Sequence, residues 1–212
     1  MEENSKQSLI QEIIESEWKM FDAVQNIGGR ADCQDDFETF SIMRSSQLSA
    51  WDTEVLESYR DDHRAAAAEG ANLIERKYAY MMQFTDPVYF GNMLARYLPP
   101  ISDEVYALVD EIAAVYSRWY REAARKYPAF VGRGRPENEE EETYGVTSVD
   151  AYLKGELYSY SDETRRRLLA MVKRMETAGE NLVCATYDAT ARSYGYRGLD
   201  DAEEKLEKRT TL

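Results

Sequence analysis

Apolar residues recur every three or four positions along most of this chain, and this spacing limits its fold more than any other feature. Leu9, Ile10, Ile13 and Ile14 begin one such series, and Val105 begins another. The spacing places apolar side chains on one face of an α-helix, whereas a half-buried strand would show strict alternation. The chain also holds 11 Gly and 5 Pro among 212 residues, fewer than average usage. The sequence therefore predicts an all-α protein.

Glycine, proline and N-cap residues divide this pattern into separate helices. Asp35, followed by Glu38, is predicted to cap the second helix. The tail from Asp200 to Leu212 is expected to be a solvated helix or a frayed end, because its charges alternate densely. The other expected helices run from Ser8 to Gly28-Gly29, from Asp35 onward, from Thr53 to about Glu69, from Asn72 to Phe84 and from Ser102 to Tyr127-Pro128, with shorter helical stretches after them.

A second level of order is an internal repeat at a spacing of 109 residues. Gln47 matches Glu156 at this offset, and the motif Gly-x-Asn-Leu occurs at Gly70 and again at Gly179. Further upstream the offset shortens to about 100. We therefore expect one domain over residues 1–212, with half-repeats at 8–98 and 102–199 and a charged tail at 200–212. Two similar halves commonly pack about a pseudo-twofold axis, and small ligands tend to bind at such interfaces.

The charge balance and the cysteine content argue against several classes of protein. The 40 Asp and Glu residues exceed the 26 Lys and Arg residues, for a net charge of −14. Because a nucleic-acid-binding protein needs cations to displace counterions, no nucleic acid partner is expected. The chain has no apolar run of the roughly 18 residues that a membrane span needs and no signal peptide, so we expect no membrane partner and a cytoplasmic location. Two cysteines and one histidine are too few for a disulfide framework or a zinc site.

The segment NIGGRADCQDD, residues 26–36, carries more polar groups than a helix junction needs. Its two glycines allow backbone N–H groups to converge, and Arg30 offers a planar guanidinium that fits a carboxylate or a phosphate. Asn26, Arg30 and Gln34 are therefore candidate ligand-binding residues. The alternative is structural: the glycines end one helix, Asp35 begins the next, and Arg30 bridges carboxylates.

The second half contains a related basic loop, Gly-Arg-Gly-Arg at residues 132–135. One hypothesis is that Arg133 or Arg135 converges with Arg30 on a single anionic ligand across the pseudo-twofold axis. The alternative is that these two arginines neutralise the acidic run Glu139–Glu142 beside them.

Two sets of polar and aromatic residues predict the walls of a pocket. Within each set the spacing of three or four positions places the side chains on one helical face. The sets are Arg44, Gln47 and Trp51 in the first half, and Tyr152, Glu156 and Tyr160 in the second. Aromatic walls with a few fixed polar groups suit a small organic ligand. An ordinary buried network between the halves explains the pattern equally well.

Asp35 and Glu156 are the candidate catalytic residues. If the protein is an enzyme, either is the expected general acid/base, with a pKa raised toward neutrality by burial. No metal and no cofactor are expected, since a helical di-metal site needs Glu-x-x-His motifs and His63 follows Arg60 at that spacing. His63 itself is expected on an exposed helix face, and Arg165-Arg166-Arg167 on a salt-bridged surface rather than at an RNA site.

Several motifs also resemble those of one protein family. They are Glu17-Trp18, NIGGRADCQDD, Met43-Arg44-Ser45-Ser46-Gln47, Glu75-Arg76-Lys77-Tyr78-Ala79-Tyr80-Met81-Met82, Gly132-Arg133-Gly134-Arg135-Pro136 and Tyr152-Leu153-Lys154-Gly155-Glu156-Leu157. Over residues 9 to about 200 the chain resembles an uncharacterised bacterial family, domain-of-unknown-function family number 4125. The resemblance gives no residue a role, but it implies that a family pattern includes Asn26, Arg30, Gln34, Asp35, Arg44, Gln47, Arg135 and Glu156.

Two functional hypotheses follow. In the first, the protein binds a small anionic or zwitterionic metabolite in a polar-aromatic pocket between its halves, and a cofactor-independent lyase or hydrolase is one form of this hypothesis. The residues assigned to that pocket are Arg30 and Arg135 as an anion clamp, Gln34, Arg44 and Gln47 as orienting groups, and Trp51 and Tyr152 as walls. In the second, the protein is a non-catalytic interaction or regulatory module whose acidic surface engages a basic protein. A homodimer is compatible with both.

Overall fold

The computed structural model describes residues 2–26, 28–137 and 147–210. Within these ranges every regular element is a helix, so the prediction of an all-α protein is confirmed. No helix in this part of the chain combines the length and the apolar character that crossing a bilayer requires.

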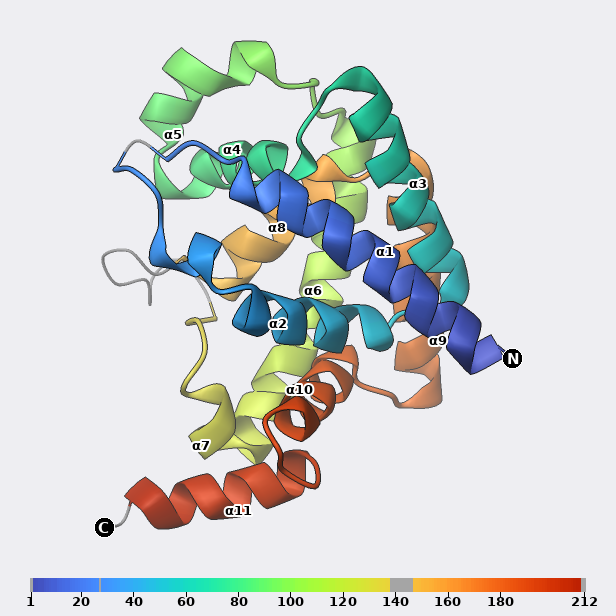
Figure 1. Ribbon diagram of the computed structural model, residues 1–212, viewed down its shortest axis with the longest axis vertical. Helices are drawn as coiled ribbons and strands as arrows, with labels where there is room; N and C mark the ends of the chain where they lie inside the picture. The colour runs from blue at the N-terminus through green and yellow to red at the C-terminus, as the bar shows by residue number, and fades with distance from the viewer. Residues whose placement is uncertain (1, 27, 138–146, 211–212) are drawn as a thin grey trace.

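Each half of the chain contributes a set of main helices (Figure 1). Those of the first half are α1 (Glu2–Asp22), α2 (Phe37–Ser49), α3 (Thr53–Glu69) and α4 (Leu73–Thr85). Those of the second half are α6 (Asp103–Lys126), α8 (Val149–Ser159), α9 (Asp162–Ala178) and α10 (Leu182–Ser193). Shorter helices are η1 (Asp32–Asp35), α5 (Pro87–Tyr89), η2 (Phe90–Leu94), η3 (Ala95–Tyr97) and α7 (Pro128–Val131), and α11 (Leu199–Thr210) ends the described chain.

The turns that follow α3 and α9 have the same geometry. Gly70 and Gly179 adopt the left-handed conformation, with φ of +68° and +70°, which glycine tolerates because it has no Cβ. Two residues later, Asn72 and Asn181 each accept a hydrogen bond at 3.0 Å from the backbone N–H three positions on. The recurring Gly-x-Asn-Leu motif is therefore a helix end followed by a helix start.

α1 ends earlier than the sequence suggests. It stops at Asp22 rather than at Gly28-Gly29. The cause is the buried side chain of Gln34, whose amide donates to the carbonyl of Phe21 at 2.9 Å and to that of Val24 at 3.1 Å. These bonds satisfy carbonyl groups that a further turn of helix would otherwise satisfy.

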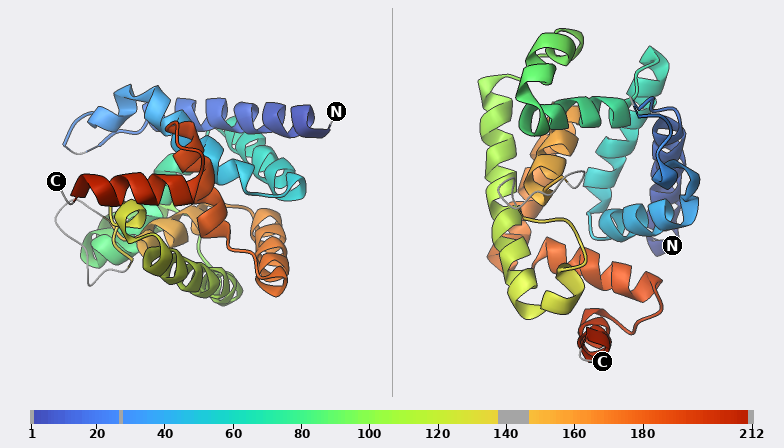
Figure 2. Two further views of the ribbon diagram at one scale, coloured as in Figure 1. Left: turned by 90° about the horizontal axis from the view of Figure 1, so that it is seen from below. Right: turned by 90° about the vertical axis from the view of Figure 1, so that its left-hand side faces the viewer.

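The core lies between the two halves, and the halves pack reciprocally. α4 packs along α8, while α10 packs against α2, so each of these pairs joins one half to the other. Within each half, α1 contacts α2 and α3, and α6 contacts α8 and α9. Figure 2 shows α1 and α6 on opposite sides of the molecule, with α4 and α8 between them. Buried side chains of both halves meet at the centre, among them Ile13, Leu48, Ile112 and Leu157.

Gly155 sets the close approach of α8 to α4. A Cβ atom at this position would overlap the Met81 side chain and would lie 2.9 Å from the carbonyl oxygen of Lys77. The absence of a side chain therefore brings the next residue, Glu156, within reach of Lys77.

The C-terminal tail is a packed helix, so the expectation of a solvated helix or frayed end is wrong for α11. Leu199 and Leu206 are buried, and α11 contacts α7 and α10 (Figure 1). Glu203 accepts hydrogen bonds from the backbone N–H groups of Ala129 and Phe130, both at 2.8 Å. This carboxylate stabilises the start of α7. Because the contact joins distant parts of the chain, the local charge pattern does not reveal it.

Candidate functional site

The predicted residues of the loop after α1 form a closed local network. The Arg30 guanidinium donates to Asp22 Oδ1 at 2.6 Å, to Asp35 Oδ1 at 2.9 Å and to the Gln34 carbonyl at 2.7 Å. Asn26 donates to the side-chain oxygen of Gln34 at 2.7 Å. Arg30 therefore bridges carboxylates, as the structural alternative predicts, and Asn26 and Gln34 hold the same loop.

Asp35 does not have the environment expected of a buried acid. Its side chain is 69% exposed and pairs with Arg30. Its predicted role as the cap of α2 belongs to the next residue, Asp36, which accepts a hydrogen bond from the Thr39 N–H at 3.0 Å. The expectation of burial is wrong because η1 turns the Asp35 side chain toward solvent, and the reason for assigning it acid/base chemistry is lost.

The basic loop of the second half covers an aromatic ring. The guanidinium carbon of Arg135 lies 4.7 Å from the ring centre of Tyr152, and its Nη1 donates to the Thr147 carbonyl at 3.2 Å. Arg133 is exposed. The acidic run Glu139–Glu142 lies outside the described residues, so its pairing with these arginines stays a prediction.

Three other predicted residues, Arg44, Gln47 and Glu156, meet at the centre of the molecule. Arg44 donates to the two carboxylate oxygens of Glu17 at 2.7 and 2.5 Å, to Glu156 at 2.9 Å and to Gln47 at 2.6 Å. Gln47 donates to the other oxygen of Glu156 at 3.3 Å, and the Lys77 amine lies 3.5 Å from this carboxylate. We call Glu17, Arg44, Gln47, Lys77 and Glu156 the Arg44 cluster.

The Arg44 cluster is buried, and its charges compensate one another. Glu17 is 0% exposed and Glu156 is 3% exposed, and the ring of Tyr152 covers Lys77 at 3.7 Å. Two carboxylates face two cations, so the cluster has no net charge. This balance is needed, because removing one partner of a buried ion pair costs about 3–5 kcal/mol.

The cluster keeps Glu156 ionised. Burial alone would raise the pKa of Glu156, but Lys77 and Arg44 outweigh burial and lower the pKa to about 2. Burial likewise disfavours the charge on Lys77, yet attraction to Glu156 holds the pKa of Lys77 above its ordinary value. The expected rise of the Glu156 pKa toward neutrality is therefore wrong, because the sequence did not reveal the two cations beside it.

Sequence reasoning missed Glu17 and Lys77. Glu17 falls four positions after Ile13 and four before Phe21, on the apolar face of α1. Lys77 likewise falls four positions after Leu73 and four before Met81, on the apolar face of α4. A charged residue on an otherwise apolar helical face is the signal that would have found both.

Tyr59 and His63 extend the network along α3. Tyr59 donates to Glu17 at 2.6 Å, and His63 Nδ1 lies 3.0 Å from the Ser16 hydroxyl. The expected exposure of His63 is wrong: it is 2% exposed, because it lies one helical turn after Tyr59 on the buried face of α3. Burial lowers the pKa of His63, so the imidazole is neutral.

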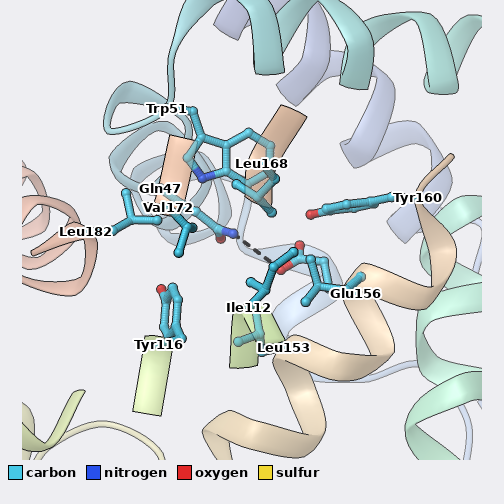
Figure 3. A pocket seen from close by; sticks show the side chains of 11 residues that line it. Gln47, Trp51, Ile112, Tyr116, Leu153, Glu156, Tyr160, Leu168, Val172 and Leu182 are labelled. Atoms are coloured by element: carbon cyan, nitrogen blue, oxygen red, sulfur yellow. Dashed lines mark hydrogen bonds between the residues drawn. The ribbon is translucent and has the colours of Figure 1, made fainter. Parts of the chain in front are cut away.

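A small cavity adjoins the Arg44 cluster at the interface between the halves (Figure 3). Its volume is about 10 Å³, close to the least space that holds one water molecule. Gln47 and Trp51 line it from the first half, and Tyr116, Glu156 and Tyr160 line it from the second, with apolar side chains between them. Four residues of the two predicted walls therefore meet here, whereas Arg44 and Tyr152 do not line the cavity.

The hydroxyl of Tyr160 points into this cavity (Figure 3). Tyr160 is 4% exposed, and its hydroxyl has no hydrogen-bond partner among the described residues. The Arg44 guanidinium lies close by but does not reach hydrogen-bonding geometry with it. Burial and the charge of Glu156 raise the pKa of Tyr160, so the hydroxyl keeps its proton and can donate it in a hydrogen bond.

The described residues do not contain a group of three His, Cys, Asp or Glu side chains that could hold a metal ion. The residues of the Arg44 cluster and of the cavity supply hydrogen-bonding groups, paired charges and aromatic rings.

The sequence was compared with protein families, with curated proteins and with solved structures. The sequence pattern of a family described as a protein of unknown function (DUF4125) matches residues 7–204, nearly the whole chain. No curated protein and no solved structure matches the chain.

Proposed function

The chain belongs to this family of proteins of unknown function, and we propose that it binds a small metabolite between its two halves, with a hydroxyl group of the ligand in the cavity. The observation that carries the proposal is the buried, unpartnered Tyr160 hydroxyl, aimed into a space that Glu156 and Gln47 also line. Buried polar groups are rarely left without partners. A group that accepts from Tyr160 and donates to Glu156 would complete the hydrogen bonds.

The charge of the Arg44 cluster favours a neutral group in this space. A ligand carboxylate would face the ionised Glu156, and an ammonium would add an uncompensated charge to a cluster that is already balanced. A hydroxyl group both donates and accepts, and it is similar in size to a water molecule. The cavity of about 10 Å³ has room for the hydroxyl alone, so the carbon that carries it has to displace one of the rings of Trp51, Tyr116 and Tyr160.

The same electrostatics favour binding over acid–base catalysis. A general acid or base works best with a pKa near the working pH, whereas the pKa of Glu156 is about 2. The lyase or hydrolase form of the hypothesis therefore has less support than simple binding.

A thermal-shift comparison of matched compounds tests the proposal. Small carboxylic acids are compared with their hydroxylated counterparts, for example propionate with lactate. We expect hydroxylated members to raise the melting temperature of the wild-type protein by binding the folded state. We expect Tyr160→Phe to weaken that binding about tenfold, or about 1.4 kcal/mol, because one hydrogen bond is lost.

Tyr187→Phe is the matched control, since Tyr187 is a partly buried tyrosine that packs against Phe130 and does not line the cavity. It should leave binding unchanged. Equal stabilisation by both members of every pair, or a Tyr160→Phe protein that binds like the wild type, would contradict the proposal.

We also propose that the two halves are repeats related by a pseudo-twofold axis. The equal turns at Gly70 and Gly179, the equal caps at Asn72 and Asn181, and the reciprocal packing of α4 on α8 and α10 on α2 support this relation.

The repeat relation gives the cavity a structural origin. At the offset of 109 residues, Arg44 corresponds to Leu153 and Tyr59 to Leu168, and both leucines line the cavity. In the first half, the polar side chains of Arg44 and Tyr59 fill the corresponding space. In the second half, two leucines stand at these positions, and the cavity lies beside them.

A non-catalytic interaction module with a basic protein partner is the second candidate. The mutual pairing of Arg44, Glu17 and Glu156 favours it, because paired charges serve as internal scaffolding as well as a binding site. In that case no compound in the screen shifts the melting temperature. For either function we propose a cytoplasmic location, which the two free cysteines, Cys33 and Cys184, support.

A further inference from the structure

An open cleft lies on the surface next to the cavity, with a volume of about 300 Å³. It is bounded by α4, by the segment that leads into α6, and by the turn between α8 and α9, so it also lies between the two halves. Its polar lining includes Arg76, Tyr80, Ser102, Ser159, Asp162 and Arg165. Pockets that hold small ligands commonly start at about 300 Å³, so the cleft is large enough for one.

Arg76 brings a free positive charge to this cleft. It is half-buried on α4, and among the described residues its guanidinium forms no ion pair and no hydrogen bond. Burial raises the pKa of Tyr80, while the charges of Arg76 and Arg165 both act to lower it. Arg76, Tyr80 and Arg165 all line the cleft.

Of these two arginines, Arg165 is the one that hydrogen bonds hold in place. It is 7% exposed, and it donates to the carbonyls of Leu157 at 3.0 Å and Tyr160, and to Asp162 at 2.5 Å. Its Nε has no partner among the described residues. Because Asp162 balances Arg165, the charge of Arg76 remains for a ligand.

We propose that this cleft binds the carboxylate or phosphate group of a small molecule, with Arg76 as the principal contact. A guanidinium forms paired, charge-assisted hydrogen bonds with either group. The cleft accounts for two basic motifs, at Arg76 and at Arg165, that lie 89 residues apart in the sequence.

Arg165 has a structural role, because it donates to carbonyls at the end of α8, but a role in stability does not explain Arg76. Under the proposed repeat, position 76 corresponds to Ala185 and position 165 to Leu56. The fold therefore forms the equivalent helices, α10 and α3, without a guanidinium at either place.

The test is a titration of the full chain with inorganic phosphate and, separately, with succinate, at an ionic strength held constant with sodium chloride. Chemical shifts of backbone amides around the cleft report binding. We expect saturable binding of at least one of the two anions, and the tighter one shows whether phosphate or carboxylate is preferred. Neither probe has a hydroxyl-bearing carbon for the cavity, so the result is independent of the proposed function.

Variants at Arg76 decide the assignment. Arg76→Gln should bind the anion at least about tenfold more weakly, equivalent to about 1.4 kcal/mol. Arg76→Lys should retain part of the affinity, because it keeps the positive charge. It should lose the rest, because an ammonium cannot form the paired hydrogen bonds of a planar guanidinium. Arg125→Gln, at an exposed position on α6, is the control and should bind like the wild type. Non-saturable shifts for both anions, or equal binding by the wild type and Arg76→Gln, would overturn the proposal.

Discussion

Arg44 and Arg30 each pair with two carboxylates, but in very different surroundings. Arg44 is buried, whereas the Arg30 side chain is 46% exposed. Arg44→Ala leaves Glu17 and Glu156 as buried charges with too few partners, and we expect a loss of about 3–5 kcal/mol in the free energy of unfolding. The partners of Arg30, Asp22 and Asp35, are already exposed to water, so Arg30→Ala should lower the free energy of unfolding much less. Urea denaturation of both variants measures the contrast, and similar midpoints would show that the Arg44 cluster does not hold the fold.

The stability of the protein should depend on pH through His63, and this effect can be assigned to one residue because His63 is the single histidine of the chain. Burial lowers the pKa of His63 below its ordinary value of 6.5. The unfolded chain therefore binds this proton more readily than the folded protein does. The histidine contribution to stability is present above pH 6.5 and is lost as the pH falls toward the lowered pKa.

Two measurements check this pH dependence. An NMR titration of the one imidazole should give a midpoint below 6.5. His63→Gln should remove that part of the decline in urea stability, although it also changes the contact with Ser16. An imidazole that titrates at or above 6.5 would place His63 in contact with solvent or with an anion.

The ends of a helix are predictable from the sequence where residues next to them mark them. They are not predictable where a residue further along the chain determines the end or the packing of the helix. The extent of α3 is predictable, because Gly70 ends it and Asn72 begins α4. The end of α1 depends on Gln34 and the packing of α11 depends on Glu203. These contacts join residues that are far apart in the chain, so helical periodicity does not contain them.

The contact between α4 and α8 makes a prediction at Gly155. In Gly155→Ala the new Cβ meets the backbone oxygen of Lys77 at 2.9 Å, and backbone cannot move aside as a side chain can. We expect a loss of about 1–3 kcal/mol, typical of an overfilled core. Gly91→Ala is the control, since a Cβ there meets no atom within 4 Å. Thermal or urea denaturation compares the two, and equal stability would mean that α8 shifts away from α4 at little cost.

For the whole molecule, the sequence repeat indicates which residues share an interface, but not how their charges pair. Gln47 and Glu156 are matched by their offset and do meet across the halves. The repeat offset does not pair Arg76 with Arg165, and only the reciprocal packing of the halves brings both to one cleft. Tyr160 borders both the cavity and the cleft, so the two sites are neighbours along one interface.

The reciprocal packing also predicts that neither half folds alone. In a fragment of residues 1–101, α4 would lose α8, and Arg44 and Lys77 would lose Glu156. In a fragment of residues 102–212, α10 would lose α2, and Glu156 would be left without either cation. Because buried charges need partners and each exposed apolar face needs a cover, we expect each fragment to unfold without a cooperative transition.

Mixing the two fragments should restore a one-to-one complex with the helical content and cooperative unfolding of the intact chain, measured by circular dichroism and analytical ultracentrifugation. Arg44→Ala in the first fragment should weaken the complex, since the ion pair with Glu156 crosses the interface. A first fragment that unfolds cooperatively by itself would mean that its helices cover their own core. The interface would then be a contact between two independently folded units. A ligand site between them would depend on how these units dock rather than on how the chain folds.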